Sequence, residues 1–136
     1  MNISSKCEYG ARAMLELARQ SNDAQPLSAT KVAEAQSIPE KYLVHILLQL
    51  KHAGLVESVR GAHGGYRLAK SAEGISLRDI VLAIDGPSLD PLPVKDEAAP
   101  ELKAVWRRAG GAIDALLAAT SIRDVIEGDD TNMYYI

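Results

Sequence analysis

The order of elements in residues 28–68 restricts the fold more than any other part of the chain. Ser28 can cap a short helix, the chain turns at residues 36–38, and Pro39 suits the start of a second helix. We expect this second helix to reach about Ala53, and a pair of short strands follows it at once. The sequence therefore predicts a helix-turn-helix with a β-hairpin wing.

The second of these helices has an inward and an outward side. Four apolar residues recur at spacings of three and four and should face a core: Leu43, Ile46, Leu47 and Leu50. Gly54 suits the end of the helix. Several side chains away from the apolar stripe can hydrogen-bond to a base edge or a phosphate: Glu40, Lys41, His45 and Gln49. The alternative is that these side chains form only a solvated surface.

The hairpin that follows combines glycines with hydrogen-bond donors. We expect strands at residues 55–59 and 66–68, joined by a loop that contains Gly61, Gly64 and Gly65. Glycines permit a tight loop and a close approach of the backbone. Three side chains could enter a minor groove or hold phosphates: Arg60, His63 and Arg67. A nucleotide-binding loop is a poor alternative, because no GxxxxGK[ST] pattern follows a strand and opens a helix.

The rest of the chain adds helices and one connector. We expect a first helix over about residues 5–20, and a helix from Ser76, which forms a capping box with Asp79, to Gly86. Residues 87–100 hold four of the six prolines and read as a connector. Residues 101–119 should form a long amphipathic helix, and Thr120 or Ser121 should cap a last short one. The apolar stripe of the long helix needs a partner, and its residues are Leu102, Val105, Trp106, Ala109, Ile113, Leu116 and Leu117.

The charged residues are distributed unevenly between the two halves of the chain. The net charge is −3, but residues 1–70 hold nine basic and six acidic side chains, whereas residues 71–136 hold six basic and twelve acidic ones. The basic first half is what attraction to phosphates requires. We therefore expect a mainly α protein with a winged helix-turn-helix domain at 1–86, a connector at 87–100, and a dimerisation helix with a C-terminal tail at 101–136.

Several function classes are excluded or disfavoured by composition. Cys7 is the only cysteine, so neither an intramolecular disulfide nor a multi-cysteine metal site can form within one chain. The histidines show no metal-ligand spacing, and no nucleophile and base stand out as a catalytic pair. No stretch is long and apolar enough to span a membrane, and the first residues lack the apolar run of a signal peptide. We therefore expect a cytoplasmic protein that is not an enzyme and needs no cofactor.

Particular motifs resemble one family. Val59-Arg60-Gly61, the run from Gly64 to Leu68, Tyr42-Leu43 and residues 50–56 are similar to the Rrf2 family of bacterial winged-helix transcription repressors, over nearly the whole chain. Residues 80–87, the helix with Trp106 and the last four residues further resemble the cysteine-metabolism branch of that family. Many relatives hold an iron-sulfur cluster on three connector cysteines, but residues 87–100 contain none, which excludes cluster sensing of that form.

The resemblance implies a homodimer on double-stranded DNA. The helices at 101–119 would cross between subunits, the recognition helices would enter successive major grooves, and the wings would reach the flanking minor grooves. Close relatives usually carry Glu-Gln where this chain has Val44-His45. Valine in place of glutamate removes an acceptor for cytosine and could contact a thymine methyl group, so the operator sequence should differ. The residues expected to contact DNA are Ser28, Thr30, Ser37, Pro39, Glu40, Lys41, Tyr42, His45, Arg60, Gly61, His63, Gly64, Gly65 and Tyr66.

The signal input has several candidates. The branch resemblance implies a partner enzyme, O-acetylserine sulfhydrylase, whose active site would accept Ile136 with its carboxylate, next to Tyr134 and Tyr135. The alternative is a tail packed on the dimer core. Cys7 could be a redox switch if the N-terminus of its helix lowers the thiol pKa, or simply a small buried thiol. The alternative to a DNA-binding repressor is a module that regulates an enzyme without binding DNA.

Overall fold

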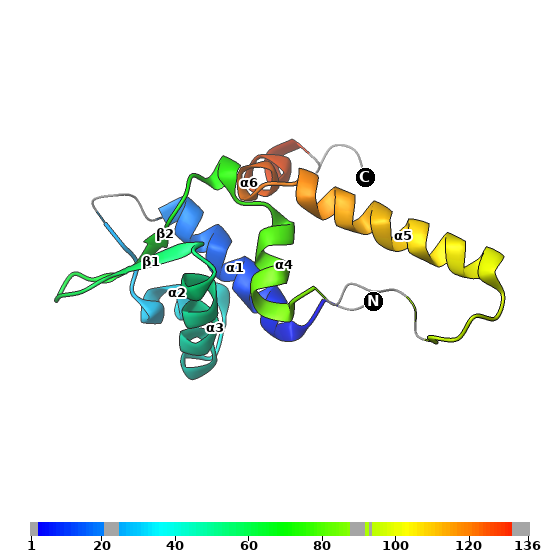
Figure 1. The fold of residues 1–136 in the computed structure, drawn as a ribbon. Coiled ribbons are helices and arrows are strands. Elements are labelled where there is room, and N and C mark those ends of the chain that lie inside the picture. Colours follow the sequence, from blue (N-terminus) through cyan, green and yellow to red (C-terminus); the bar gives the residue numbers. More distant parts are fainter. Residues whose placement is uncertain (1–2, 21–24, 88–91, 93, 132–136) are drawn as a thin grey trace.

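The computed structural model describes residues 3–20, 25–87, 92 and 94–131, and within the last range the side chains of 129–131 are left out. Its elements follow the chain as α1 (Ser5–Gln20), α2 (Ala29–Gln36), α3 (Glu40–His52), β1 (Val56–Val59), β2 (Gly65–Leu68), the 3-10 helix η1 (Ala72–Gly74), α4 (Leu77–Asp85), α5 (Pro100–Ala119) and α6 (Ile122–Thr131). The prediction of a mainly α fold with one small hairpin is confirmed (Figure 1).

The capping residues predicted from the sequence lie at the ends of α2 and α3. The Ser28 side chain accepts a hydrogen bond from the amide of Lys31, which caps α2. Gly54 has a φ of +77°, and the amides of Gly54 and Leu55 donate to the carbonyls of Lys51 and Leu50 at 2.9 and 3.0 Å. This pair of bonds is the Schellman arrangement, which satisfies carbonyl groups that the end of a helix leaves open. Glycine at 54 therefore ends α3 and turns the chain into β1.

One hydrophobic core joins the helices to the hairpin. The four stripe residues of α3 are fully buried, as are Ala13, Met14 and Leu17 of α1. Val32 of α2 and Ile80 of α4 belong to the same cluster, so α1 is the central helix on which the others pack (Figure 1). Among the described residues no polar or charged residue is buried. The inward stripe predicted from spacing is confirmed.

A backbone contact anchors the hairpin. β1 and β2 pair antiparallel from Val56 opposite Leu68 to Val59 opposite Gly65, so each strand begins one residue away from the prediction. The segment before α2 forms an isolated antiparallel bridge with β2. The amide of Leu27 donates to the carbonyl of Tyr66 at 2.9 Å, and the amide of Tyr66 donates back at 2.7 Å. These two bonds tie the hairpin to the start of the helix-turn-helix.

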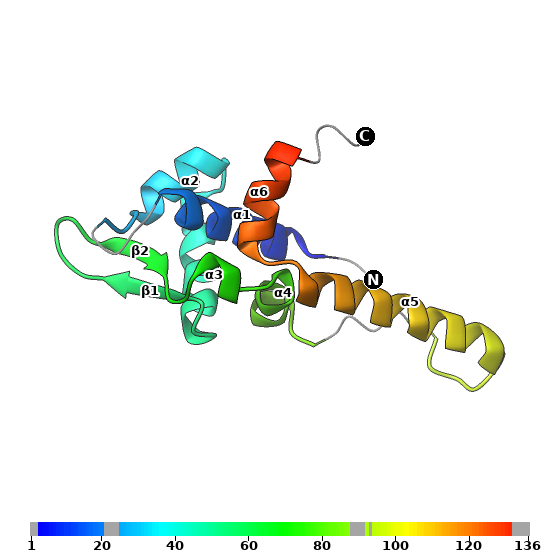
Figure 2. The same cartoon turned by 90° about the horizontal axis from the view of Figure 1, so that it is seen from above.

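The long helix α5 joins the rest of the protein at its C-terminal end. Ser76 and Ser121 form an isolated antiparallel bridge, and Arg78 of α4 donates to Asp114 of α5 at 2.8 Å. From this base α5 projects away from the other helices in both views (Figures 1 and 2). The capping box of Ser76 and Asp79 is confirmed. The sequence did not predict η1, and α6 continues to Thr131.

Two consecutive leucines of α3 that differ in burial allow a matched test of the core. Leu47 is fully buried and Leu48 is 47% exposed. We expect Leu47→Ala to lower the free energy of unfolding by about 2–5 kcal/mol, because it leaves a cavity. Leu48→Ala should change it by less than about 0.5 kcal/mol. Urea denaturation measures both values, and equal losses would contradict the packing described above.

Candidate nucleic-acid interface

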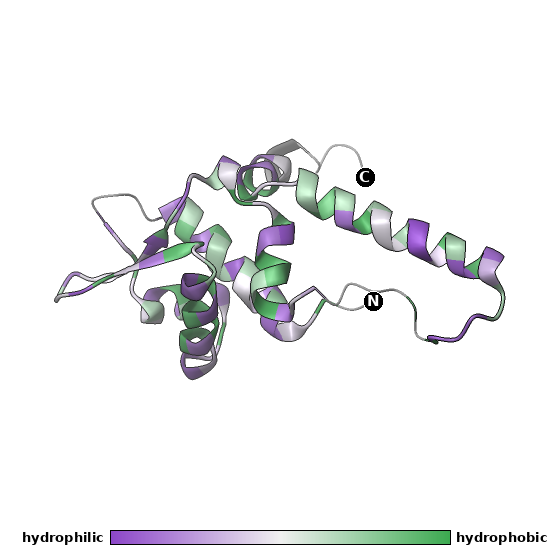
Figure 3. Cartoon of the chain, in the orientation of Figure 1, coloured by the Kyte–Doolittle hydropathy of each residue, from purple (hydrophilic) through white to green (hydrophobic). Residues whose placement is uncertain are grey.

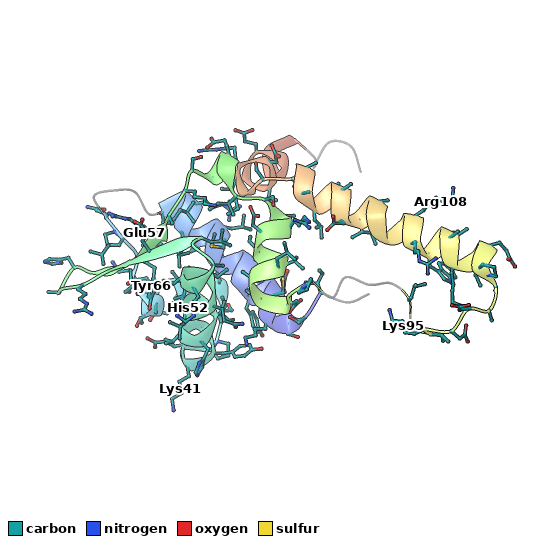
Figure 4. The ribbon with its side chains drawn as sticks, in the orientation of Figure 1. Lys41, His52, Glu57, Tyr66, Lys95 and Arg108 are labelled. Atoms are coloured by element: carbon teal, nitrogen blue, oxygen red, sulfur yellow. The ribbon has the colours of Figure 1, made fainter. Side chains whose placement is uncertain are left out.

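The burial of one side of α3 fixes which side chains point outward. A helix turns by 3.6 residues, so the residues opposite the buried stripe recur at spacings of three and four. We define the outward face of α3 by five exposed residues: Lys41, Val44, His45, Leu48 and His52. Figure 4 shows Lys41 at the lower end of α3, pointing away from the protein. This face can therefore meet a partner along the whole length of the helix.

A side-chain hydrogen bond joins two predicted contact residues at the starts of α2 and α3. The hydroxyl of Thr30 donates to a carboxylate oxygen of Glu40 at 2.5 Å. Ser37, in the left-handed region with a φ of 55°, and Pro39, at the N-cap of α3, are both exposed. The turn thus presents its polar residues on the surface beside the first turn of α3, but Glu40 already accepts a hydrogen bond from the protein.

Two other side chains of α3 that were candidates for DNA contact pack against the protein itself. Tyr42 packs edge-on against Tyr9 of α1, with ring centroids 5.6 Å apart and an angle of 88° between the planes. Gln49 is half-buried, and its side-chain oxygen is enclosed without a hydrogen-bond partner among the described residues. The sequence predicts that the side chain of Gln49 points outward, and this is wrong for its oxygen, which points into the protein. The reason is geometric, because position 49 lies at the flank of the helix.

The loop of the hairpin presents two free donors. We call the hairpin with its loop, residues 56–68, the wing. Arg60 and His63 are exposed in its loop, and the wing extends beyond the helices (Figure 1). Arg67 lies opposite Glu57 in the register and donates to its carboxylate at 3.1 Å. The cation of Arg67 is thus partly neutralised, and Arg60 is the exposed arginine of the wing.

Two glycines of the wing are needed by the protein's own backbone. A Cβ atom at Gly65 would lie 2.2 Å from the carbonyl oxygen of Leu27, and one at Gly64 would lie 2.1 Å from that of Val59. Both distances are far below any real contact, so only glycine fits. Tyr66 is half-buried and packs against the core. These three residues thus shape and anchor the wing, whatever the loop contacts.

The expected helix-dipole effect on Cys7 is outweighed by burial. Cys7 is 2% exposed. Burial, together with the negative charges of Asp85 and Glu8, raises the pKa of its thiol from 9.0 to about 11. The prediction of a lowered pKa is wrong, and the alternative of a small buried thiol is confirmed. The predicted contact residues Tyr134, Tyr135 and Ile136 lie outside the described residues.

The outward face also contains residues that the sequence reasoning did not select. Val44, Leu48 and His52 were absent from the expected contact set, although their spacing from Lys41 and His45 follows the helical period. Selection by hydrogen-bonding ability passed over Leu48, which is apolar, and Val44 was considered only as the replacement of a Glu that close relatives carry. The signal that finds them is position opposite the buried stripe, which ignores residue type.

A three-helix unit whose second and third helices form a helix-turn-helix, followed directly by a hairpin wing, defines the winged-helix class of DNA-binding proteins. Within that class the chain belongs to the Rrf2 family, whose model, described as an iron-dependent transcriptional regulator, matches residues 3–128. The motifs of the wing and of α3 that carried the resemblance lie inside this range.

Individual relatives agree with this assignment over nearly the whole chain. The chain is 34% identical to the HTH-type transcriptional regulator CymR of Bacillus subtilis (strain 168), over all of both sequences. The solved structure of B. subtilis CymR matches with a TM-score of 0.84 and covers 92% of this chain and 95% of that one. The structure of T. potens IscR matches with a TM-score of 0.79 at 32% identity, over 95% and 88% of the two chains. These relatives are transcriptional regulators and not enzymes.

The family description mentions iron, and the donor set of this chain does not fit an iron-sulfur cluster. Such clusters are held by several cysteine thiolates. The one thiol here, Cys7, is buried in α1 and keeps its proton to a high pH. The described residues include no group of three or more His, Cys, Asp or Glu side chains placed to bind a metal ion.

The structure also bears on the prediction that no segment spans a membrane. Over the residues that the structure describes, every helix is too short or too polar to cross a lipid bilayer.

The raised pKa of Cys7 predicts a specific pH dependence of stability. Between pH 9.0 and about 11 the unfolded chain loses the thiol proton while the folded chain keeps it. The folded state therefore binds more protons, and the free energy of unfolding should fall as pH rises through this window. Urea denaturation of Cys7→Ala should lack this component of the fall. Identical pH profiles for the two proteins would contradict the assignment.

Proposed function

We propose that the protein is a DNA-binding transcription repressor that acts as a homodimer. The observation that carries the proposal is the combination of the exposed outward face of α3 with the exposed Arg60 and His63 of the wing. In such an arrangement α3 enters the major groove by its N-terminal residues, and Arg60 and His63 reach the minor groove or its phosphates. The basic balance of residues 1–70 favours the same partner.

The residues around the ends of α2 have a positional role in this proposal. Ser28 and Thr30 lie at the start of α2, and Ser37 and Pro39 lie between α2 and α3. Their hydroxyl and backbone groups are suited to phosphate contacts that set the register on DNA. Lys41 and His45 project from the first half of α3 and are suited to base edges. Gly61, Gly64, Gly65 and Tyr66 would act through the shape of the wing, since two of them are fitted to the protein's own backbone.

The homodimer is proposed from the exposed apolar side of α5. We call this set the α5 row: Leu102, Val105, Trp106, Ile113 and Leu116. Each is between 40% and 65% exposed, and their spacing places them on one side of the helix. Hydrophobic residues recur along the whole of α5 where it projects from the body (Figure 3). An apolar row of this length is typical of an interface, and a second copy of α5 would cover it.

The regulated genes are proposed from a relative, and the partner enzyme from the resemblance of the sequence to the cysteine-metabolism branch of the family. The similar B. subtilis protein is described as the global cysteine regulator of that organism. We infer that this chain controls genes of cysteine metabolism, and that O-acetylserine sulfhydrylase modulates it through Tyr134, Tyr135 and Ile136.

Fluorescence-anisotropy titrations of promoter fragments at several salt concentrations test the DNA-binding proposal. Wild type should bind specific fragments with a strong salt dependence. Arg60→Ala should weaken binding and reduce the slope of log K against log salt by about one for each subunit, because one phosphate or groove contact is lost. Arg108→Ala removes the same group from α5, far from the wing, and serves as the matched control (Figure 4).

Two outcomes would contradict parts of the proposal. Equal effects of Arg60→Ala and Arg108→Ala would remove the wing from the interface, and the absence of any specific fragment would favour the module that regulates an enzyme without DNA.

Repeating the titration with saturating O-acetylserine sulfhydrylase should strengthen binding. No change would exclude that enzyme as the modulator while leaving the DNA-binding result intact.

A charge placed in the α5 row tests the homodimer. Ile113→Glu should convert the dimer to a monomer, because the interface would bury an unpaired carboxylate. Binding to a site with two half-sites should then weaken by about a hundredfold or more, because the second contact is no longer tethered to the first. Sedimentation measures the oligomeric state. Ala115→Glu adds the same charge on the opposite side of α5 and should remain dimeric; a monomer there as well would refute the proposed row.

A further inference from the structure

Two large apolar side chains lie exposed on the outward face of α3. Val44 is 45% exposed and Leu48 is 47% exposed, and they are four residues apart, so they are neighbours on the same side of the helix. Neither belongs to the hydrophobic core or to the partly buried residues packed on it. The fold therefore gives no account of two apolar residues at these positions.

Cationic and imidazole side chains surround this apolar pair. Lys41 precedes it by one turn, His45 and Lys51 lie beside it, and His52 follows it by one turn, all exposed. The nearest acidic residue on α3 is Glu40, whose carboxylate accepts the hydroxyl of Thr30. An apolar pair inside a basic rim, on the exposed side of α3, matches a polyanion with an apolar feature of its own better than it matches an apolar protein surface.

The major groove of DNA offers one such apolar feature. Among the four bases only thymine carries a methyl group at the groove edge, and the phosphates on either side supply the negative charge. We propose that Val44 and Leu48 are specificity-determining residues that read thymine methyl groups in each half-site. This inference rests on the proposed DNA-binding function and adds the base that is read.

The geometry of the helix restricts where these thymines lie. Four residues of α-helix rise by about 6 Å, and successive base pairs are stacked about 3.4 Å apart. The two methyl groups should therefore be about one to two base pairs apart, on the edge that faces α3. Lys41 and His45, next to the pair, are placed to contact neighbouring purine edges or phosphates.

Replacement of thymine by deoxyuridine tests the inference, because it removes the methyl group and keeps the base pair. The binding site is first selected from a random duplex library with the full-length protein. Each thymine of one half-site is then replaced in turn. One or two replacements should weaken wild-type binding by about fourfold each, the factor that corresponds to about 0.8 kcal/mol for one buried methyl group.

Variants connect the lost methyl group to a side chain. Val44→Ala and Leu48→Ala should each bind the thymine and deoxyuridine forms of one position with equal affinity, and their thermal unfolding should match wild type because both positions are exposed. His45→Ala is the matched control on the same face. It should weaken binding to both forms and keep the fourfold difference between them.

The outcomes separate this inference from the function on which it rests. Neutral replacement of every thymine, or an unchanged deoxyuridine penalty in both alanine variants, overturns the inference and leaves specific DNA binding in place. Full DNA affinity in both variants also overturns it and assigns the pair to a protein contact. A library selection that enriches no sequence overturns the proposed function itself, and the inference falls with it.

Discussion

The burial of the apolar stripe of α3 against α1 is the contact on which the interface depends. Leu43, Ile46, Leu47 and Leu50 are fully enclosed, so α3 has one rotational position about its axis. Rotation by one residue would expose several of these side chains, and each costs about 1.5–3 kcal/mol to transfer to water. The same contact that stabilises the core therefore fixes which side chains α3 presents outward.

The wing and α5 are held to this unit by short polar contacts. Two backbone hydrogen bonds between Leu27 and Tyr66 join the wing to the start of α2, and glycine at 65 is needed for the chains to approach so closely. At the other end, the pairing of Arg78 with Asp114 ties α4 to α5. A partner bound along α5 is thus mechanically connected, through α4 and the shared core, to the helix-turn-helix.

Some parts of the interface were visible in the sequence and others were not. Arg60 and His63 could be selected because a glycine-rich loop between two strands must be exposed. The pKa of Cys7 could not be predicted, because position near a helix N-terminus is local, whereas burial beside Asp85 joins residues far apart in the chain. Arg67 was a candidate donor until the strand register placed it opposite Glu57.

The sequence by itself determined the order of the α-helices, the approximate bounds of most of them, the inward stripe of α3 and the family, because these follow from local spacing, capping residues and short motifs. Only the tertiary structure decided that Tyr42 packs on Tyr9 and that Gly64 and Gly65 are fitted to the protein backbone. It also decided that the side-chain oxygen of Gln49 is enclosed, although the residue lies off the buried stripe of α3. The physical reason is that burial and close approach depend on the packing of distant segments, which local periodicity does not specify.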